Sequence, residues 1–223
     1  LEGRLFRSAV FEEAVSFVLA EFEKAGYPFA AINVVSFARE DNDEGFSEAR
    51  LVLLYDIKKQ ARIDRILIEG NTKSKSDAVI RESGIRVGSK YDKEKINRIS
   101  VLLNRTGFYG AEGIPDYYYN QKGEGTLVIR IKEKNTNAFD GIIGYVPKSN
   151  VIPGYFTGFA EISLGNLFGT GRNFGFKWQK LDKTSQDLNV RYLEPWIFGI
   201  PVNLKLSFSQ KKADSTYIKY GFD

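Results

Sequence analysis

The sequence predicts an α+β region followed by an antiparallel, all-β meander of about six strands. Two observations lead to this prediction. In the first part of the chain, segments with apolar residues at helical spacing alternate with short strand-like segments. Beyond Thr136, almost every segment alternates apolar and polar residues and is bounded by turn residues, and glycine and aromatic residues become more frequent. The chain therefore changes character once, near Thr136.

The composition excludes several kinds of enzyme site. The chain has 223 residues and contains neither Cys nor His, so a Ser-His-Asp triad, a thiolate nucleophile or a disulfide cannot be built from it. We therefore expect no enzyme activity and no cofactor. The net charge of +4 is small, and the basic and aromatic residues are dispersed, which argues against a nucleic-acid site.

Two further features concern membrane-spanning helices and the start of the chain. No segment approaches the ~18 consecutive apolar residues of a transmembrane helix. The sequence contains no Met, so Leu1 is expected to be an internal position of a longer precursor.

Residues 1–59 are predicted to form one helix and two strands. Apolar residues between Val10 and Phe22 recur at helical spacing, and Gly26 ends the helix. The strands "FAAINVVSF" and "SEARLVLLYDIK" follow. The polar run "AREDNDEG" between them is predicted to be a hairpin loop.

Residues 60–135 carry a fuller version of the same pattern. The strand "ARIDRILIEGN" is followed by the helices "SKSDAVIRESGI" and "YDKEKINRISVLLNRTGFYG", and then by a hairpin made of "GIPDYYYNQ" and "GTLVIRIKEK". This gives the order β-α-α-β-β. Because residues 1–59 show the same final helix, strand and strand, we predict a tandem repeat of roughly 70–80 residues whose first copy lacks its start.

Residues 136–223 are predicted to form a meander with one apolar face. Its strands are "AFDGIIGYV", "GYFTGFAEISLG", "NFGFKWQKL", "QDLNVRYLEPW", "VNLKLSFSQKK" and "TYIKYGF". In a transmembrane barrel this face meets lipid, whereas in a soluble sandwich it meets a second sheet. Glycines within the strands favour the curved sheet of a barrel, whose remaining strands would have to follow Asp223. The candidate lipid-facing residues are Ile162, Leu164, Phe174, Phe176, Trp178, Leu204, Leu206 and Phe208.

Several motifs resemble those of one known family. Residues 62–110 are similar to a polypeptide-transport-associated (POTRA) domain in the "IEGN" strand end, the "IR" helix, the "G-x-x-Y" step and the "L-x-x-x-G-F/Y" helix end. The segment "NLFGTGRNFGF" resembles the first strand-turn-strand junction of BamA/TamA-type outer-membrane assembly factors. The resemblance covers nearly the whole chain. It divides the chain into an N-terminally incomplete POTRA domain (1–59), a second POTRA domain (60–135) and the first part of a transmembrane β-barrel (136–223).

The resemblance implies a location and a set of partners. The barrel would lie in the outer membrane of a Gram-negative bacterium, in contact with membrane lipid, and the POTRA domains would lie in the periplasm. There they would bind unfolded outer-membrane protein clients, and accessory lipoproteins or other periplasmic proteins. In this family the first and last barrel strands meet at a weak seam, where client strands are thought to enter.

The first predicted strand supplies the candidate gate of that seam. Its residues are Ala138, Phe139, Gly141, Ile142, Gly144 and Tyr145. Glycines within a strand weaken its pairing, so this strand would make an easily opened edge. An ordinary frayed edge strand is the alternative interpretation.

A second candidate site lies on the hairpin of residues 113–134. Asp116, Tyr117, Tyr118 and Tyr119 form a strand that could be a sheet edge, and such an edge can bind an extended peptide by strand addition. The tyrosines would add contact area for clients or a partner protein. Alternatively, they pack on the two helices of the same domain.

Three other functions share parts of this pattern. A two-partner-type secretion pore uses the same arrangement of POTRA domains and barrel. A POTRA-barrel anchor could carry a patatin-like lipase upstream of Leu1, which a Gly-x-Ser-x-Gly motif there would support. A soluble binding module with a β-sandwich would leave membranes without detergent. The first prediction remains a factor that assembles β-barrels by thinning lipid and offering a strand edge as a template.

Overall fold

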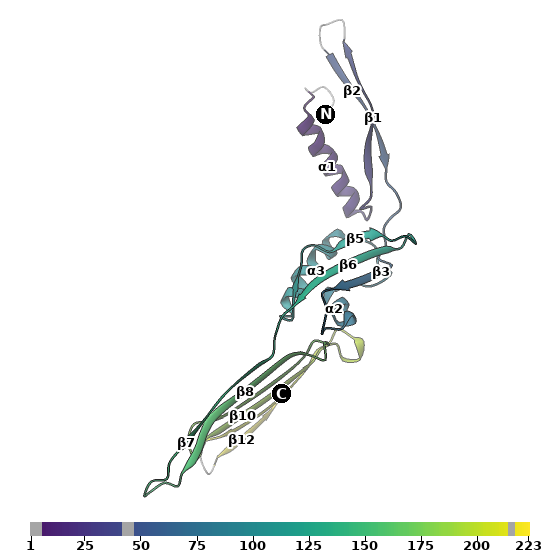
Figure 1. Cartoon of the computed structure of the whole chain (residues 1–223). Helices are drawn as coiled ribbons and strands as arrows, with labels where there is room; N and C mark the ends of the chain where they lie inside the picture. The colour runs from purple at the N-terminus through teal and green to yellow at the C-terminus, as the bar shows by residue number, and fades with distance from the viewer. Residues whose placement is uncertain (1–5, 42–46, 214–216) are drawn as a thin grey trace. The chain divides into compact units, whose positions relative to one another are not determined.

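The structure is a computed structural model that describes residues 6–41, 47–213 and 217–223 (Figure 1). The chain forms two compact units, and each is interleaved in sequence. The first unit contains Leu1–Leu67, Gly84–Ile99 and Gly113–Ile129, and the second contains Ile68–Ser83, Ser100–Glu112 and Arg130–Asp223.

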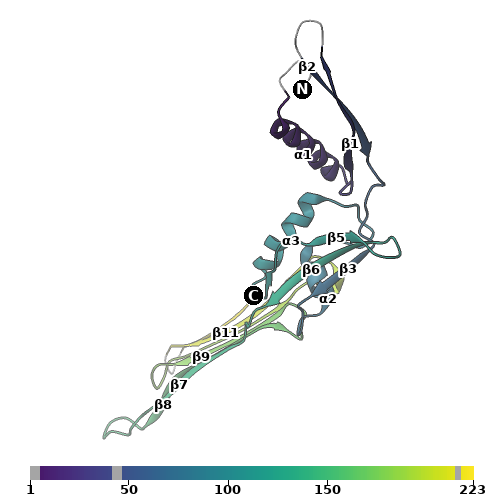
Figure 2. The same cartoon turned by 45° about the horizontal axis from the view of Figure 1, so that its top comes forward.

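The N-terminal part of the first unit consists of a helix and a two-stranded ribbon. Helix α1 (Ser8–Lys24) runs beside the antiparallel strands β1 (Ala31–Asp41) and β2 (Ser47–Asp56), as Figure 2 shows. The rings of Phe22 and Tyr55 lie 6.4 Å apart and join the helix to the ribbon. The predicted loop "AREDNDEG" was placed too early, because its first four residues continue β1. Its other four lie outside the described residues.

Residues 61–134 contain two helices and a four-stranded sheet. The elements are β3 (Arg65–Glu69), α2 (Ser76–Ser83), α3 (Lys93–Arg105), β4 (Tyr109–Ala111), β5 (Asp116–Tyr119) and β6 (Gly125–Glu133). The strand order is β3-β6-β4, and β5 also pairs with β6.

The short strand β4 is an addition to the predicted β-α-α-β-β order. It pairs with Ile131–Glu133 of β6, whereas β5 pairs with Gly125–Val128 of the same strand. Gly113, with φ +75°, and Pro115 separate the two segments. Because Pro lacks an N–H and Gly relaxes the backbone, one edge strand is broken into two.

The fully buried hydrophobic side chains of the described residues all lie between Ala61 and Ile131. Ile96, Ile99 and Leu103 follow one face of α3 at spacings of three and four residues, and Leu127, Ile129 and Ile131 are buried in β6. Burial of each such side chain contributes about 1.5–3 kcal/mol. None of the described helices is both long and apolar enough to pass through a membrane.

The C-terminal part of the second unit is the predicted antiparallel meander. Its strands are paired in sequence order, with β7 and β12 at the two edges of the sheet. A 3-10 turn, η1 (Ile197–Gly199), joins β10 to β11. The last predicted strand began at Thr216, which lies outside the described residues. The strands are β7 (Ala138–Val146), β8 (Tyr155–Leu167), β9 (Arg172–Lys180), β10 (Gln186–Glu194), β11 (Leu204–Lys212) and β12 (Ile218–Phe222).

Candidate functional site: the meander face, its first strand and its first turn

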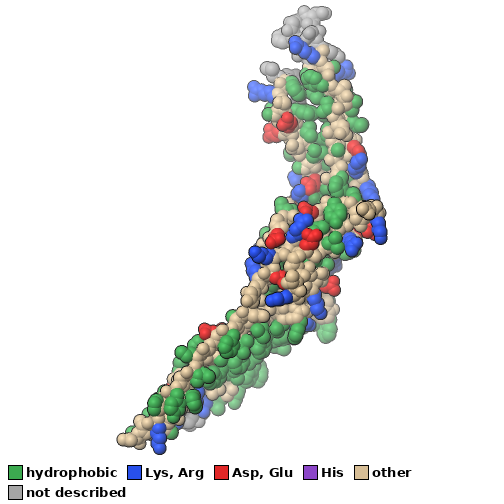
Figure 3. Space-filling view, viewed as in Figure 1, with side chains coloured by type: hydrophobic (Ala, Val, Ile, Leu, Met, Phe, Trp, Pro, Cys, Tyr) green, Lys and Arg blue, Asp and Glu red, His purple; other side chains and the backbone are tan. Residues whose placement is uncertain are grey.

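Cross-strand pairing places all eight candidate lipid-facing residues on one face of the meander. Ile162 lies opposite Phe176, which lies opposite Val190, which in turn lies opposite Phe208. Leu164, Phe174, Tyr192 and Leu206 form the neighbouring row, and Trp178 and Leu204 extend this face at its two ends. Figure 3 shows hydrophobic side chains gathered over these strands. A continuous apolar face of this kind requires a lipid or protein partner.

The opposite face of the same sheet is polar. Glu161 lies opposite Lys177, and their charged groups are 3.8 Å apart. Lys211 lies between Asp187 on one neighbouring strand and Lys219 on the other. This alternation of apolar and charged faces is the arrangement of a barrel wall between lipid and water.

The candidate gate residues lie in β7, at an edge of the sheet. Strand β7 pairs with β8 from Ala138–Ser163 to Val146–Tyr155, and no other described strand pairs with it. Its side chains are exposed on both faces: Ile142 is 63% exposed and Ile143 is 77% exposed. The unpaired backbone groups of such an edge can accept another strand.

Glycine residues allow β7 and β8 to approach each other closely. Gly158 of β8 has φ +155°, and a Cβ there would collide with the carbonyl oxygen of Ile142. On β7 itself, a Cβ at Gly141 would lie 3.1 Å from the carbonyl oxygen of Phe159, and one at Gly144 would lie 3.0 Å from Thr157 Oγ1. The two strands therefore approach so closely at these positions that side chains fit poorly.

The tyrosines of β5 divide into two sets. The rings of Tyr117 and Tyr119 lie 5.8 and 5.0 Å from that of Phe29, and Tyr117 also lies 5.0 Å from Tyr91. The Tyr117 hydroxyl donates a hydrogen bond to the carbonyl oxygen of Arg62 at 2.7 Å. These two side chains thus pack inside the first unit, against Phe29 and Tyr91. Tyr118 points the other way and is 41% exposed.

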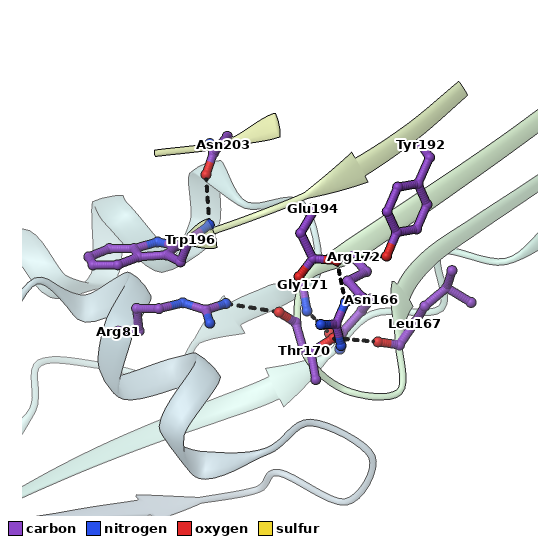
Figure 4. Close-up of polar contacts among 10 residues, drawn as sticks. All are labelled: Arg81, Asn166, Leu167, Thr170, Gly171, Arg172, Tyr192, Glu194, Trp196 and Asn203. Atoms are coloured by element: carbon purple, nitrogen blue, oxygen red, sulfur yellow. Dashed lines mark hydrogen bonds and ion pairs between the residues drawn. The ribbon is translucent and has the colours of Figure 1, made fainter. Parts of the chain in front are cut away.

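The turn between β8 and β9 forms contacts that the sequence did not predict (Figure 4). Asn166 Nδ2 donates to Ser74 Oγ at 2.8 Å, and its Oδ1 accepts from the Gly171 N–H at 2.9 Å. Arg81 of α2 donates to the carbonyl oxygen of Thr170 at 2.8 Å, and its guanidinium lies 5.6 Å from the centre of the Trp196 ring. Nothing in the sequence of this turn indicates which residues it touches.

The carboxylate of Glu133 holds the loop of residues 72–74, which contacts the β8–β9 turn. Burial raises its pKa, but hydrogen bonds from Ser74, from Thr72 Oγ1 at 2.7 Å and from the Lys73 N–H at 3.0 Å outweigh this effect. The net result is a pKa of about 2 for Glu133. The carboxylate thus orders the backbone of residues 72–74.

The low pKa of Glu133 predicts acid sensitivity. The folded state lowers this pKa from its ordinary value of 4.5 to about 2. The contribution of the Glu133 carboxylate to the free energy of unfolding is therefore complete above pH 4.5 and is lost as the pH falls towards 2. The carboxylate is partly solvated, so we expect it to contribute only about 1 kcal/mol to the free energy of unfolding. Urea unfolding of residues 60–135 between pH 7 and pH 2.5 measures it. Glu133→Gln should remove this part of the pH dependence, whereas Glu112→Gln, at an exposed site, should leave it unchanged.

Among the described residues, no group of three or more Asp, Glu, His or Cys side chains could hold a metal ion. The candidate site is therefore built from strand edges, apolar surface and hydrogen bonds.

Comparisons with known proteins identify the class of this chain. Residues 61–134 match the family model "POTRA: Surface antigen variable number repeat". A solved structure, that of BamA from Haemophilus ducreyi lacking POTRA domains 1–3, covers the whole chain with a TM-score of 0.60 at 20% identity, and this chain covers 42% of it. Residues 61–134 are thus a POTRA domain, and the antiparallel meander of six strands that follows shares its fold with the corresponding part of that BamA structure.

Two relatives of known name are BamA proteins. It is 31% identical over 122 residues to the outer membrane protein assembly factor BamA of Nitratidesulfovibrio vulgaris, covering 54% of this chain and 15% of that protein. It is 25% identical over 222 residues to BamA of Neorickettsia risticii, covering 99% of this chain and 26% of that protein. The predicted resemblance to BamA-type factors is confirmed. The chain spans about a quarter or less of these relatives' length.

Proposed function

We propose that this chain is the POTRA and gate-strand portion of a factor that inserts β-barrel proteins into the outer membrane. The observation that carries the proposal is β7, which pairs with β8 and with no other described strand, exposes apolar side chains on both faces, and lies at one edge of a sheet with an apolar and a polar face. The relatives named as outer membrane protein assembly factors support the same function.

The proposed mechanism uses backbone hydrogen bonds rather than covalent chemistry. An unpaired strand edge in lipid costs several kcal/mol per unsatisfied group, because no water is present to replace the missing partner. A client strand that pairs with β7 satisfies these groups in both strands at once. Since backbone pairing does not depend on side-chain identity, one edge can serve clients of different sequence. The edge thereby lowers the barrier to strand insertion.

The test follows insertion directly. The full-length protein is reconstituted in lipid vesicles, and the folding of a urea-denatured outer-membrane barrel is followed with and without it. We expect insertion to be accelerated at least about tenfold, which corresponds to a barrier lowered by about 1.4 kcal/mol. If the factor is folded in the vesicles and insertion is not accelerated, the proposal is wrong. A dedicated secretion pore or an anchor for an upstream enzyme would then be the better explanation.

We also propose that the edge around Tyr118 helps to bind clients or a periplasmic partner. The exposed ring and the strand backbone of β5 offer an apolar contact beside hydrogen-bonding groups.

Tyr118→Ala is expected to weaken this binding. Truncating an exposed aromatic anchor should lower photo-crosslinking from Asp116 to partners by about fivefold, the equivalent of about 1 kcal/mol. Ile114→Ala is the matched control, since Ile114 is 66% exposed and precedes the same strand. Equal crosslinking in a folded Tyr118→Ala variant would remove this edge from the proposed function.

A further inference from the structure

The turn between β8 and β9 fits against the loop of residues 73–75 at backbone level. The Lys75 N–H donates a hydrogen bond to the carbonyl oxygen of Gly169 at 2.9 Å. Gly169 is buried, and a Cβ there would collide with the carbonyl oxygen of Lys73 and lie 2.9 Å from Ser74 Cα. Since no side chain separates the two segments, a small displacement of either would break the hydrogen bond or cause a clash.

One side chain, that of Asn166, both shapes this turn and connects it to the loop. Its backbone has φ +52°, a left-handed conformation that Asn tolerates better than most residues. Its amide oxygen accepts from Gly171 within the turn, and its amide nitrogen donates to Ser74. Ser74 is only 5% exposed, so water competes little for this contact.

Arg81 of α2 adds contacts with two different turns of the meander. Its guanidinium donates to Thr170 in the β8–β9 turn and lies over the ring of Trp196, which follows β10 (Figure 4). A single helix residue therefore contacts both turns.

We propose that the turn of residues 166–171 is a clamp that holds α2 and the loop of residues 73–75 rigidly on the first strands of the meander. The covalent link between β6 and β7, residues 134–137, then does not act as a free hinge. The purpose of the clamp would be to keep the gate strand at a fixed position relative to these POTRA elements, and this purpose rests on the proposed function. The existence of the clamp does not, because it can be measured without any client.

The test measures a distance distribution by pulsed electron paramagnetic resonance. Spin labels are attached to Asn104→Cys on α3 and Lys183→Cys in the β9–β10 loop, both exposed, in the full-length protein without other cysteines and reconstituted in lipid. The parent should give one narrow distance distribution. Gly169→Ala, which inserts a methyl group into the contact, should at least double its width.

Gly199→Ala is the matched control. Gly199 has φ +77° and Gly169 has φ +70°, so both substitutions strain the backbone similarly, but nothing lies within 4 Å of a Cβ at Gly199. It should leave the width unchanged. Should Gly169→Ala prevent folding, Ser74→Ala, which removes the hydroxyl that accepts from Asn166 and also contacts Glu133, should broaden the distribution by a smaller amount. A broad distribution in the parent, or equal widths in the folded variants and the parent, would overturn the clamp whether or not the protein accelerates insertion.

Discussion

Gly158→Ala is expected to detach β7 from β8 and to abolish most of the acceleration of client insertion. Gly158 has φ +155°, and its added Cβ would collide with the carbonyl oxygen of Ile142, in the middle of β7. The contact involves backbone on both sides, so no side chain can rotate away to relieve it. We expect a cost of about 1–3 kcal/mol in strand pairing, comparable to other strained backbone sites. For a gate strand this is enough to depopulate the paired edge.

The measurement is the insertion rate of a urea-denatured barrel, compared between Gly158→Ala and Gly175→Ala. Gly175 also lies in the interior of a strand, but a Cβ there would meet only Arg191, at 3.8 Å, an ordinary contact. Gly175→Ala should retain the parent rate, whereas Gly158→Ala should lose about tenfold or more. A fully active Gly158→Ala variant would mean that β7 is not the edge that clients use.

The sequence predicted the meander well because each strand carries its own evidence. In β11, Leu204, Leu206 and Phe208 alternate with Lys205, Ser207 and Ser209, so the face of each side chain follows from the period of two. Strand β7 was predicted with its observed bounds, since Asn137 before it and Pro147 after it are poor strand residues. The two helices of residues 61–134 follow from the same kind of local pattern.

Contacts between segments far apart in sequence could not be predicted in this way. Asn166 and Ser74 are 92 positions apart, and so short a polar residue in a glycine-rich turn has no periodicity that indicates its partner. The contacts of Arg81 could not be predicted either, because this residue lies on the less apolar side of a short helix. Tyr117 and Tyr119 of β5 pack against Phe29, which belongs to the preceding region of the chain, so this contact could not be predicted from the local pattern of β5. Local patterns therefore predicted the faces of the sheets, but not the contacts that join them.

Phe176→Lys is expected to prevent the meander from folding stably in a membrane. Phe176 lies in the middle of the apolar face, between Ile162 of β8 and Val190 of β10. If this face meets lipid, a lysine near the bilayer midplane costs about 2–4 kcal/mol, which is a large share of the stability of a typical domain. Urea unfolding of the full-length protein in vesicles should show the loss.

The same strand provides the control, because Lys177 beside Phe176 already carries a positive charge on the opposite face. Gln179→Lys adds one more lysine to that polar face, across from Asp187. It should change the free energy of unfolding by no more than about 0.5 kcal/mol, as surface substitutions usually do. Equal stability of the two variants would contradict a lipid-facing position for Phe176. A large difference would distinguish the two faces of one strand by their surroundings, since the added charge and the strand are the same.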